Sequence, residues 1–134
     1  MTISEYIVDF LKAFEEIEID QNHVAEGSDK YGLFKSPSRD VKEYTDSSYE
    51  ITEYYQFMAR QRAIADSERK EADEFLEDLT YKIDDYGYTE NYPDIDNGRT
   101  VTKIAITGCP YPAYAEGKDA MYQMTIAITY ERER

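Results

Sequence analysis

The sequence predicts a single α+β domain: a four- to five-stranded sheet, mostly antiparallel or mixed, with two helices packed on one face. Two segments repeat apolar residues every three or four positions, as amphipathic helices do. Several other segments are rich in Tyr, Ile, Thr and Phe, which suit strands. The length of 134 residues matches one ordinary domain, so we assign residues 1–134 to it.

The first helix is predicted from its cap at Thr2 to about Glu16. Thr2 and Glu5 have the spacing of a capping box. The apolar residues of this segment form one stripe: Ile3, Tyr6, Ile7, Phe10, Leu11, Phe14 and Ile17. Residues 17–19 favour the start of an extended segment, and residues 21–30 favour a polar loop that contains Gly27.

A hairpin is predicted in the segment that follows. Residues 31–35 favour a short strand that ends at Ser-Pro-Ser, residues 36–38. Residues 39–45 alternate weakly, and residues 49–60 form a long strand rich in Tyr, Ile, Thr and Phe. The tight turn between these last two, at residues 46–48, indicates that they pair as a hairpin.

The second helix begins with Asp66 or Ser67 as its cap and ends at Gly87. Its expected buried face consists of Ala72, Phe75, Leu76, Leu79, Ile83 and Tyr86, and acidic residues fill the opposite face. Residues 88–98 then read as a loop that closes with the turn pair Asn-Gly, and residues 101–107 as another strand.

The end of the chain combines a predicted loop with the clearest strand. Residues 108–119 contain two prolines and two glycines and favour a long projecting loop. Beyond it, apolar side chains alternate with more polar ones, which predicts a sheet with one buried face. We expect this buried face to hold Tyr122, Met124, Ile126, Ile128 and Tyr130, and the other face to hold Gln123, Thr125, Ala127 and Thr129.

The formal net charge of −14 limits the classes of partner. A protein this acidic repels nucleic-acid phosphates and anionic membranes at long range, so we expect neither a membrane nor a sequence-specific nucleic acid as partner. Residues 66–96 carry twelve of the acids and three bases, which favours a solvated acidic face. The N-terminus lacks the basic region of a signal peptide, and we expect a cytoplasmic chain.

The residue types of catalytic and metal sites do not converge in the sequence, so no catalytic, metal-binding or cofactor-binding residue is predicted. His23 is the only histidine and Cys109 the only cysteine. The acid pairs are adjacent residues, which diverge on a helix. The segment that begins at Asp94 resembles a calcium loop, but Ala105 stands where that loop needs a bidentate Glu.

The order of the motifs resembles the minor capsid and tail-terminator proteins of long-tailed phages that infect Gram-positive bacteria. After the N-terminal amphipathic helix come the motifs YGLFKSPSR (31–39), YTDSS (44–48), YYQFMARQ (54–61), EFLEDL (74–79) and the strand 122–130. The resemblance covers nearly the whole chain. The family's hairpin turn is commonly Asp-Gly-Ser, and Ser47 replaces the Gly here. The family's second helix often carries a Trp near its end, where Tyr81, Lys82 and Ile83 stand in this chain.

The resemblance implies a non-enzymatic virion component, assembled in the host cytoplasm and located in the tail at the head–tail interface. It implies a ring of six copies that caps the tail tube, contacts the tail tube protein and the head–tail connector protein, and leaves a lumen through which DNA can pass. A ring needs head-to-tail contacts, which the two predicted loops can supply. The residues we expect in subunit or partner contacts are His23, Asp29, Lys30, Arg39, Tyr111, Tyr114 and Lys118.

Two alternatives remain open from the residues alone. An acidic inhibitor that mimics DNA would present its carboxylates along one surface, and the second helix has them on its outer face. A metal-dependent nuclease would need convergent carboxylates and a divalent metal.

Overall fold

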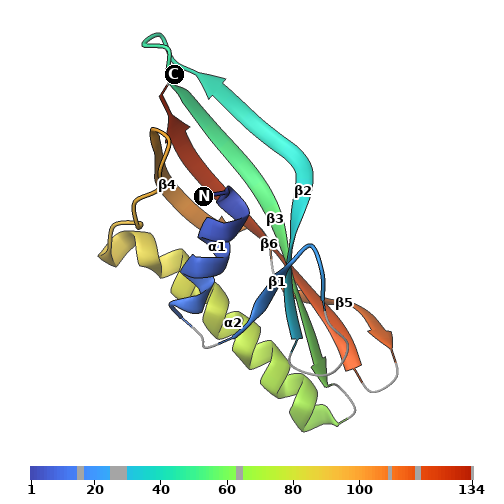
Figure 1. Ribbon diagram of the computed structural model, residues 1–134. Helices are drawn as coiled ribbons and strands as arrows, with labels where there is room; N and C mark the ends of the chain where they lie inside the picture. The colour runs from blue at the N-terminus through green and yellow to red at the C-terminus, as the bar shows by residue number, and fades with distance from the viewer. Residues whose placement is uncertain (15–16, 25–29, 63–64, 109, 117–118, 134) are drawn as a thin grey trace.

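A computed structural model describes residues 1–14, 17–24, 30–62, 65–108, 110–116 and 119–133. Its α+β fold, with two helices and a mixed sheet, confirms the predicted fold class (Figure 1). The sheet has six strands where four or five were predicted. The elements in chain order are α1 (Ile3–Lys12), β1 (Ile19–Gln21), β2 (Lys30–Glu43), β3 (Tyr49–Arg62), α2 (Asp66–Thr89), β4 (Arg99–Ile106), β5 (Tyr111–Glu116) and β6 (Asp119–Arg132).

The sheet has the strand order β1-β2-β3-β6-β4, and β5 pairs with the remaining stretch of β6. Among the strands of the described residues, β1 and β2 alone run parallel, and the other pairs are antiparallel. The long strands β2, β3 and β6 run the length of the molecule, and the tip of the β2–β3 hairpin lies near the C-terminus (Figure 1). The last strand of the chain therefore lies inside the sheet, between β3 and β4.

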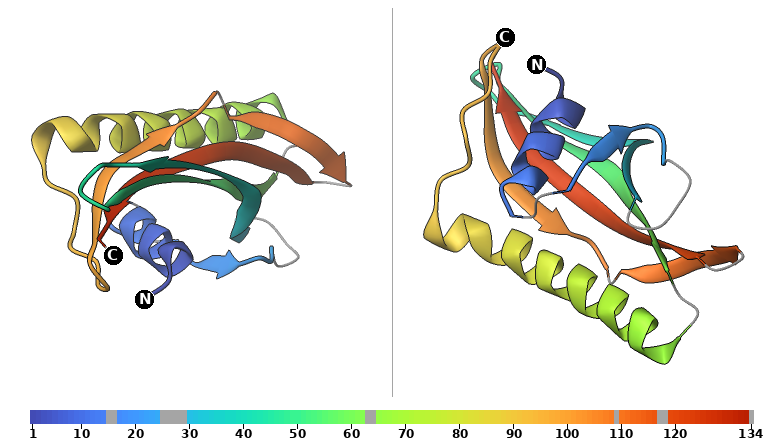
Figure 2. Two further views of the ribbon diagram at one scale, coloured as in Figure 1. Left: turned by 90° about the horizontal axis from the view of Figure 1, so that it is seen from above. Right: turned by 60° about the horizontal axis from the view of Figure 1, so that its bottom comes forward.

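One face of the sheet carries the hydrophobic core. On β6 the expected alternation is confirmed: Ile126 and Ile128 are fully buried, while Thr125 and Thr129 are half-buried on the other face. The core rows of β3 and β6 meet in register, with Tyr55 opposite Ile126. Both helices contribute to the same buried cluster, and the twisted sheet places them along different stretches of this face (Figure 2).

The helix α1 begins as predicted. Thr2 is its N-cap, and the Thr2 hydroxyl oxygen accepts a hydrogen bond of 3.1 Å from the backbone N–H of Glu5. The helix ends at Lys12, earlier than the predicted Glu16, which lies outside the described residues. The buried side chains of α1 are Ile3, Tyr6, Ile7, Val8, Phe10 and Leu11, so the predicted stripe faces the core.

The helix α2 differs from the prediction at both ends. Its N-cap is Ala65, not Asp66 or Ser67, and the carboxylate of Glu68 accepts a 3.0 Å hydrogen bond from the Ala65 N–H. Gly87 does not end the helix, which continues to Thr89. A Cβ at Gly87 would lie 2.8 Å from the hydroxyl oxygen of Tyr92, so this glycine permits a close approach within the helix.

The Ser-Pro-Ser segment, residues 36–38, does not end a strand. The strand β2 continues through it, with a shift of register against β3 between Lys35 and Arg39. Pro37 lies in this irregularity, where the ladder does not require a donor from every residue. The two predicted segments, 31–35 and 39–45, are therefore one bulged strand.

The expected projecting loop at residues 108–119 is also wrong. Residues 111–116 form β5, which pairs antiparallel with the start of β6. A shift of register between Pro112 and Tyr114 accommodates the proline, which cannot donate to a regular ladder. Together with the short β1, this strand accounts for the difference in strand number.

Two positions in and beside β2, Ser47 and Gly32, have backbone surroundings that favour glycine. Ser47, at the tip of the β2–β3 hairpin, has a φ of 73°, in the left-handed region that favours glycine. Gly32 lies beneath the segment that follows β1, because a Cβ there would come within 2.1 Å of the carbonyl oxygen of His23. A side chain at position 32 would therefore collide with backbone.

Candidate functional site

The distribution of charge separates the two sides of the molecule. Residues 66–96, which contain α2 and the loop after it, hold twelve acids and three bases. The hairpin segment 30–62 holds five acids and six bases, and residues 97–134 hold four acids and five bases. The strands after β1 are therefore nearly neutral, while α2 carries an acidic face of exposed side chains: Glu71, Asp73, Glu74, Glu77, Asp78, Asp84 and Asp85.

The side of the sheet away from the core carries a band of uncharged side chains along β3 and β6, and the charged side chains of Asp40 and Lys103 flank this band on the neighbouring strands. We define this open face by the half-buried side chains of β3 and β6 that point away from the helices: Thr52, Tyr54, Gln56, Met58, Gln123, Thr125, Ala127 and Thr129. The hydroxyls of Thr52 and Thr129 lie 3.0 Å apart, and the amide of Gln123 donates to Gln56 at 2.7 Å. These cross-strand bonds hold the polar side chains in place.

A buried carboxylate lies on the opposite face, at the β2 bulge. Glu53 is 7% exposed, and its two oxygens accept hydrogen bonds from the hydroxyls of Tyr130 (2.5 Å) and Tyr55 (3.2 Å). The ammonium group of Lys35, on the exposed rim, lies 3.5 Å from Glu53. Burial, together with the Glu53 carboxylate, raises the pKa of Tyr130 to about 12 and raises the pKa of Tyr55 well above its usual range.

The bulge surrounds an open depression of about 310 Å³ beside Glu53. Its lining residues are Lys35, Ser36, Pro37, Ser38, Arg39 and Glu53. The two cations, Lys35 and Arg39, stand on the rim, where an acidic group could approach them. This depression brings one predicted contact residue, Arg39, next to a buried charge that the sequence analysis did not single out.

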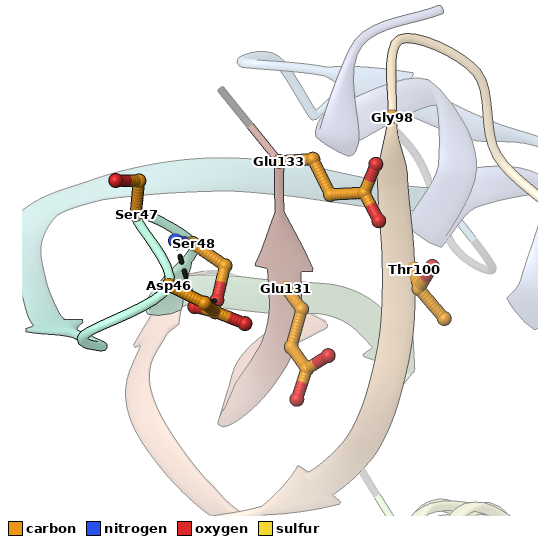
Figure 3. Close-up of a pocket in the computed structure, with 7 residues that line it drawn as sticks. All are labelled: Asp46, Ser47, Ser48, Gly98, Thr100, Glu131 and Glu133. Carbon is orange, nitrogen blue, oxygen red and sulfur yellow. Dashed lines mark hydrogen bonds between the residues drawn. The ribbon is translucent and has the colours of Figure 1, made fainter.

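A second depression, of about 350 Å³, lies at the end of the sheet, between the hairpin tip and the adjoining ends of β4 and β6 (Figure 3). It is lined by Asp46, Ser47, Ser48, Gly98, Thr100, Glu131 and Glu133. The Asp46 carboxylate accepts hydrogen bonds from the hydroxyl (2.6 Å) and the backbone N–H (3.1 Å) of Ser48, which lower the pKa of Asp46. The Asp46 side chain therefore stabilises the hairpin turn.

A third depression, of about 540 Å³, follows the outer edge of β4 beside the end of α2. Side chains satisfy the backbone of this edge. The Tyr92 hydroxyl oxygen accepts a 3.1 Å hydrogen bond from the Ile104 N–H, and Asp84 accepts one of 3.2 Å from the Ile106 N–H. The outer edge of β4 is thus closed to another strand at these positions.

The predicted contact residues do not form one cluster. His23 is exposed after β1, Lys30 is exposed at the start of β2, and Tyr111 is 51% exposed on β5. Arg39 lies in the other half of β2, on the bulge depression. Asp29, Lys118 and the side chain of Tyr114 lie outside the described residues.

Glu53 and its tyrosine partners were missed, although the sequence contains one signal for them. In residues 49–60 the apolar positions alternate, and Glu53 occupies a position between Ile51 and Tyr55 on the buried row. An acid at such a position requires hydrogen-bond donors. Nothing in the local sequence identifies Tyr130, 77 residues away, as one of them.

Within the described residues, no group of three or more His, Cys, Asp or Glu side chains is arranged to hold a metal ion. No helix among these residues is both long and apolar enough to cross a membrane. In comparisons with known proteins, no family model matches the chain, and no curated protein matches it significantly.

Proposed function

We propose that this protein is a structural assembly protein, a tail-terminator subunit of a long-tailed phage. In its working form it is a ring of six copies that caps the tail tube, ends tail elongation and offers a docking surface to the head–tail connector. The motif order described above suggests the class. The observation that carries the proposal is the separation of an acidic helix face from the open face, whose side chains along β3 and β6 are uncharged.

A closed ring requires a head-to-tail interface, in which two different surfaces of neighbouring copies meet. The open face suits one side of such an interface. Charged residues are depleted at the centres of interfaces, whereas Tyr and Met are enriched, and the open face contains Tyr54 and Met58. An uncharged surface also avoids the repulsion that two copies with a net charge of −14 experience elsewhere.

The proposal assigns no catalytic role to the chain. The protein acts through its surfaces. The open face and the bulge depression contact other proteins, and the acidic face of α2 repels the DNA that passes through the ring. The partners are further copies of this chain, the tail tube protein and the connector protein, and the location is the virion tail.

Deletion of the gene from its phage tests the proposal. We expect overlong or unjoined tails beside full heads. Complementation with Ala127→Lys, which places a charge at the centre of the open face opposite Tyr54 and Ala105, should fail although the variant folds. The matched variant Ala13→Lys, at the exposed end of α1, should restore normal tails. Normal-length tails joined to heads after the deletion would overturn the proposal.

A second candidate function is an acidic inhibitor that mimics DNA. The row of exposed carboxylates on α2 favours it, because phosphates on DNA are also regularly spaced charges. This inhibitor would bind a nucleic-acid-binding protein and would leave tail length unchanged on deletion. Reversing Glu74 and Asp78 to Lys should abolish that inhibition, whereas Ala127→Lys should not affect it.

A further inference from the structure

Within the described residues, the outer edge of β2 is covered along only part of its length. The parallel strand β1 pairs with residues 31–33. Asn22 extends this cover, since its N–H donates to the Leu33 carbonyl at 2.8 Å and its side-chain oxygen accepts from the Lys35 N–H at 3.4 Å. Beyond the bulge, residues 39–43 are all exposed, and no described strand lies beside them on the outer side.

The hairpin turn determines which backbone groups of this stretch point outward. The backbone N–H of Tyr44 donates to the Ser48 carbonyl at 2.9 Å, so the backbone groups of Tyr44 point toward β3. In an antiparallel ladder, hydrogen-bonded positions alternate along the strand. The N–H and C=O groups of Arg39, Val41 and Glu43 therefore point away from β3, toward the outer side of the strand.

The charges of residues 39–43 are complementary to the charges of the same segment in a second copy that runs antiparallel to it. Residues 39–43 read Arg-Asp-Val-Lys-Glu, so the signs of charge run plus, minus, neutral, plus, minus. We propose that this edge pairs antiparallel with the same edge of a second copy, about a two-fold axis at Val41. Arg39 then lies opposite the second copy's Glu43, and Asp40 opposite its Lys42, so that each pair occurs twice.

This register is favoured over its neighbours. Centring the pair on Asp40 or on Lys42 would place like charges directly opposite each other, which destabilises a sheet. A parallel arrangement in register would align every charge with its own kind. Only the register centred on Val41 joins opposite charges, and it also pairs the outward backbone groups of positions 39, 41 and 43 with one another.

Val41 gives this contact an apolar centre. Its side chain is 49% exposed on a strand edge whose other exposed residues at 39–43 are charged. The contact is isologous, so it forms a dimer and differs from the head-to-tail contacts of a ring. It rests on β2 alone and stands whether or not the ring forms. The small surface predicts a weak, concentration-dependent dimer.

Crosslinking tests the register. In a Cys109→Ser background, Val41→Cys should form a disulfide-linked dimer on mild oxidation, because directly opposed hydrogen-bonded residues have Cα atoms about 5.5 Å apart. The matched variant Asp40→Cys should not crosslink, since its counterpart lies two residues along the strand, beyond the roughly 7 Å limit for a disulfide. Equal crosslinking of both variants, or of neither, would overturn the proposal.

Charge reversal tests the ion pairs without cysteine. In sedimentation velocity, Lys42→Glu should weaken dimerisation about tenfold, because it opposes a carboxylate to Asp40 twice. Adding Asp40→Lys to it should restore the dimer. Lys70→Glu, which makes the same change of charge on α2 (77% exposed side chain), should leave the dimer intact. A chain that stays monomeric at all concentrations, or a double variant that fails to recover while its melting temperature is unchanged, would refute the pairing.

Discussion

The Tyr130 hydroxyl donates a 2.5 Å hydrogen bond to Oε2 of Glu53, and both residues lie buried on the core face of the sheet. The two strands that carry them, β6 and β3, are adjacent. Tyr55 donates to the other oxygen of the same carboxylate. The phenols must keep their protons for these bonds to exist, so the arrangement links stability to alkaline pH.

The free energy of unfolding should fall as pH rises from about 10 to about 12. The pKa of Tyr130 is raised to about 12 from an ordinary value of 10, and burial likewise raises that of Tyr6 to about 12. A raised folded-state pKa gives stability that is fully present below pH 10 and is lost through this window. Urea unfolding at several pH values measures it. Tyr130→Phe should flatten the fall, whereas Tyr88→Phe, at a 91% exposed position, should not.

Replacing Ile128 by Ala should lower the free energy of unfolding by about 2–4 kcal/mol, because the side chain is fully buried at the centre of β6. Chemical denaturation measures the loss. Val41→Ala, at an exposed position, should change stability by less than about 0.5 kcal/mol. A neutral Ile128→Ala would show that Ile128 faces solvent.

Ser47→Gly should stabilise the protein by about 1 kcal/mol, since Ser47 holds a left-handed φ of 73° that costs a residue with a Cβ about that much. Thermal and urea unfolding both report the gain. Ser38→Gly, within β2, should instead cost about 0.5–1 kcal/mol. If both variants lose stability, the hairpin turn does not have this conformation in solution.

Gly32→Ala should destabilise the protein by about 1–3 kcal/mol or prevent folding, because the new Cβ would meet the His23 carbonyl. The neighbouring substitution Ser36→Ala, on the same strand but outside this contact, serves as the control. Comparable stability of the two variants would mean that residues 22–24 do not lie over β2.

The salt dependence of assembly should reveal what limits the proposed ring. Copies with a net charge of −14 repel one another, and the Debye length falls from roughly 10 Å at 0.1 M salt to about 3 Å at 1 M. We therefore expect ring formation to increase with salt. Electron microscopy and light scattering at both concentrations measure it, and a ring that dissociates at high salt would point to cross-subunit ion pairs instead.

The sequence predicts best where periodicity is strong and the partner is local. The alternation of residues 122–130 identified the core row of β6, and the helical steps of α1 identified its buried stripe. The cap of α1 was readable because Thr2 and Glu5 are three residues apart. These features depend on short-range geometry, which the sequence contains directly.

The errors fall where long-range pairing overrides local signals. The prolines at positions 37 and 112 suggested a strand end and a loop, but each lies at a shift of register within a strand. Likewise, Gly87 resembled a helix end, yet it accommodates Tyr92 inside α2. The Glu53–Tyr130 pair forms because β3 and β6 lie side by side. The two residues are 77 positions apart in the chain, and no local pattern encodes their contact.

The anchoring of α1 has a consequence for the order of folding. The Tyr6 hydroxyl donates to the carbonyl of Pro93, 87 residues later, and the ring of Phe10 packs edge-on against Tyr86 at a centroid distance of 5.0 Å. During synthesis, α1 emerges first but these partners emerge much later. The apolar stripe of α1 therefore lacks these partners until about two-thirds of the chain has been synthesised. Such late, long-range closure slows folding and exposes the nascent chain to aggregation.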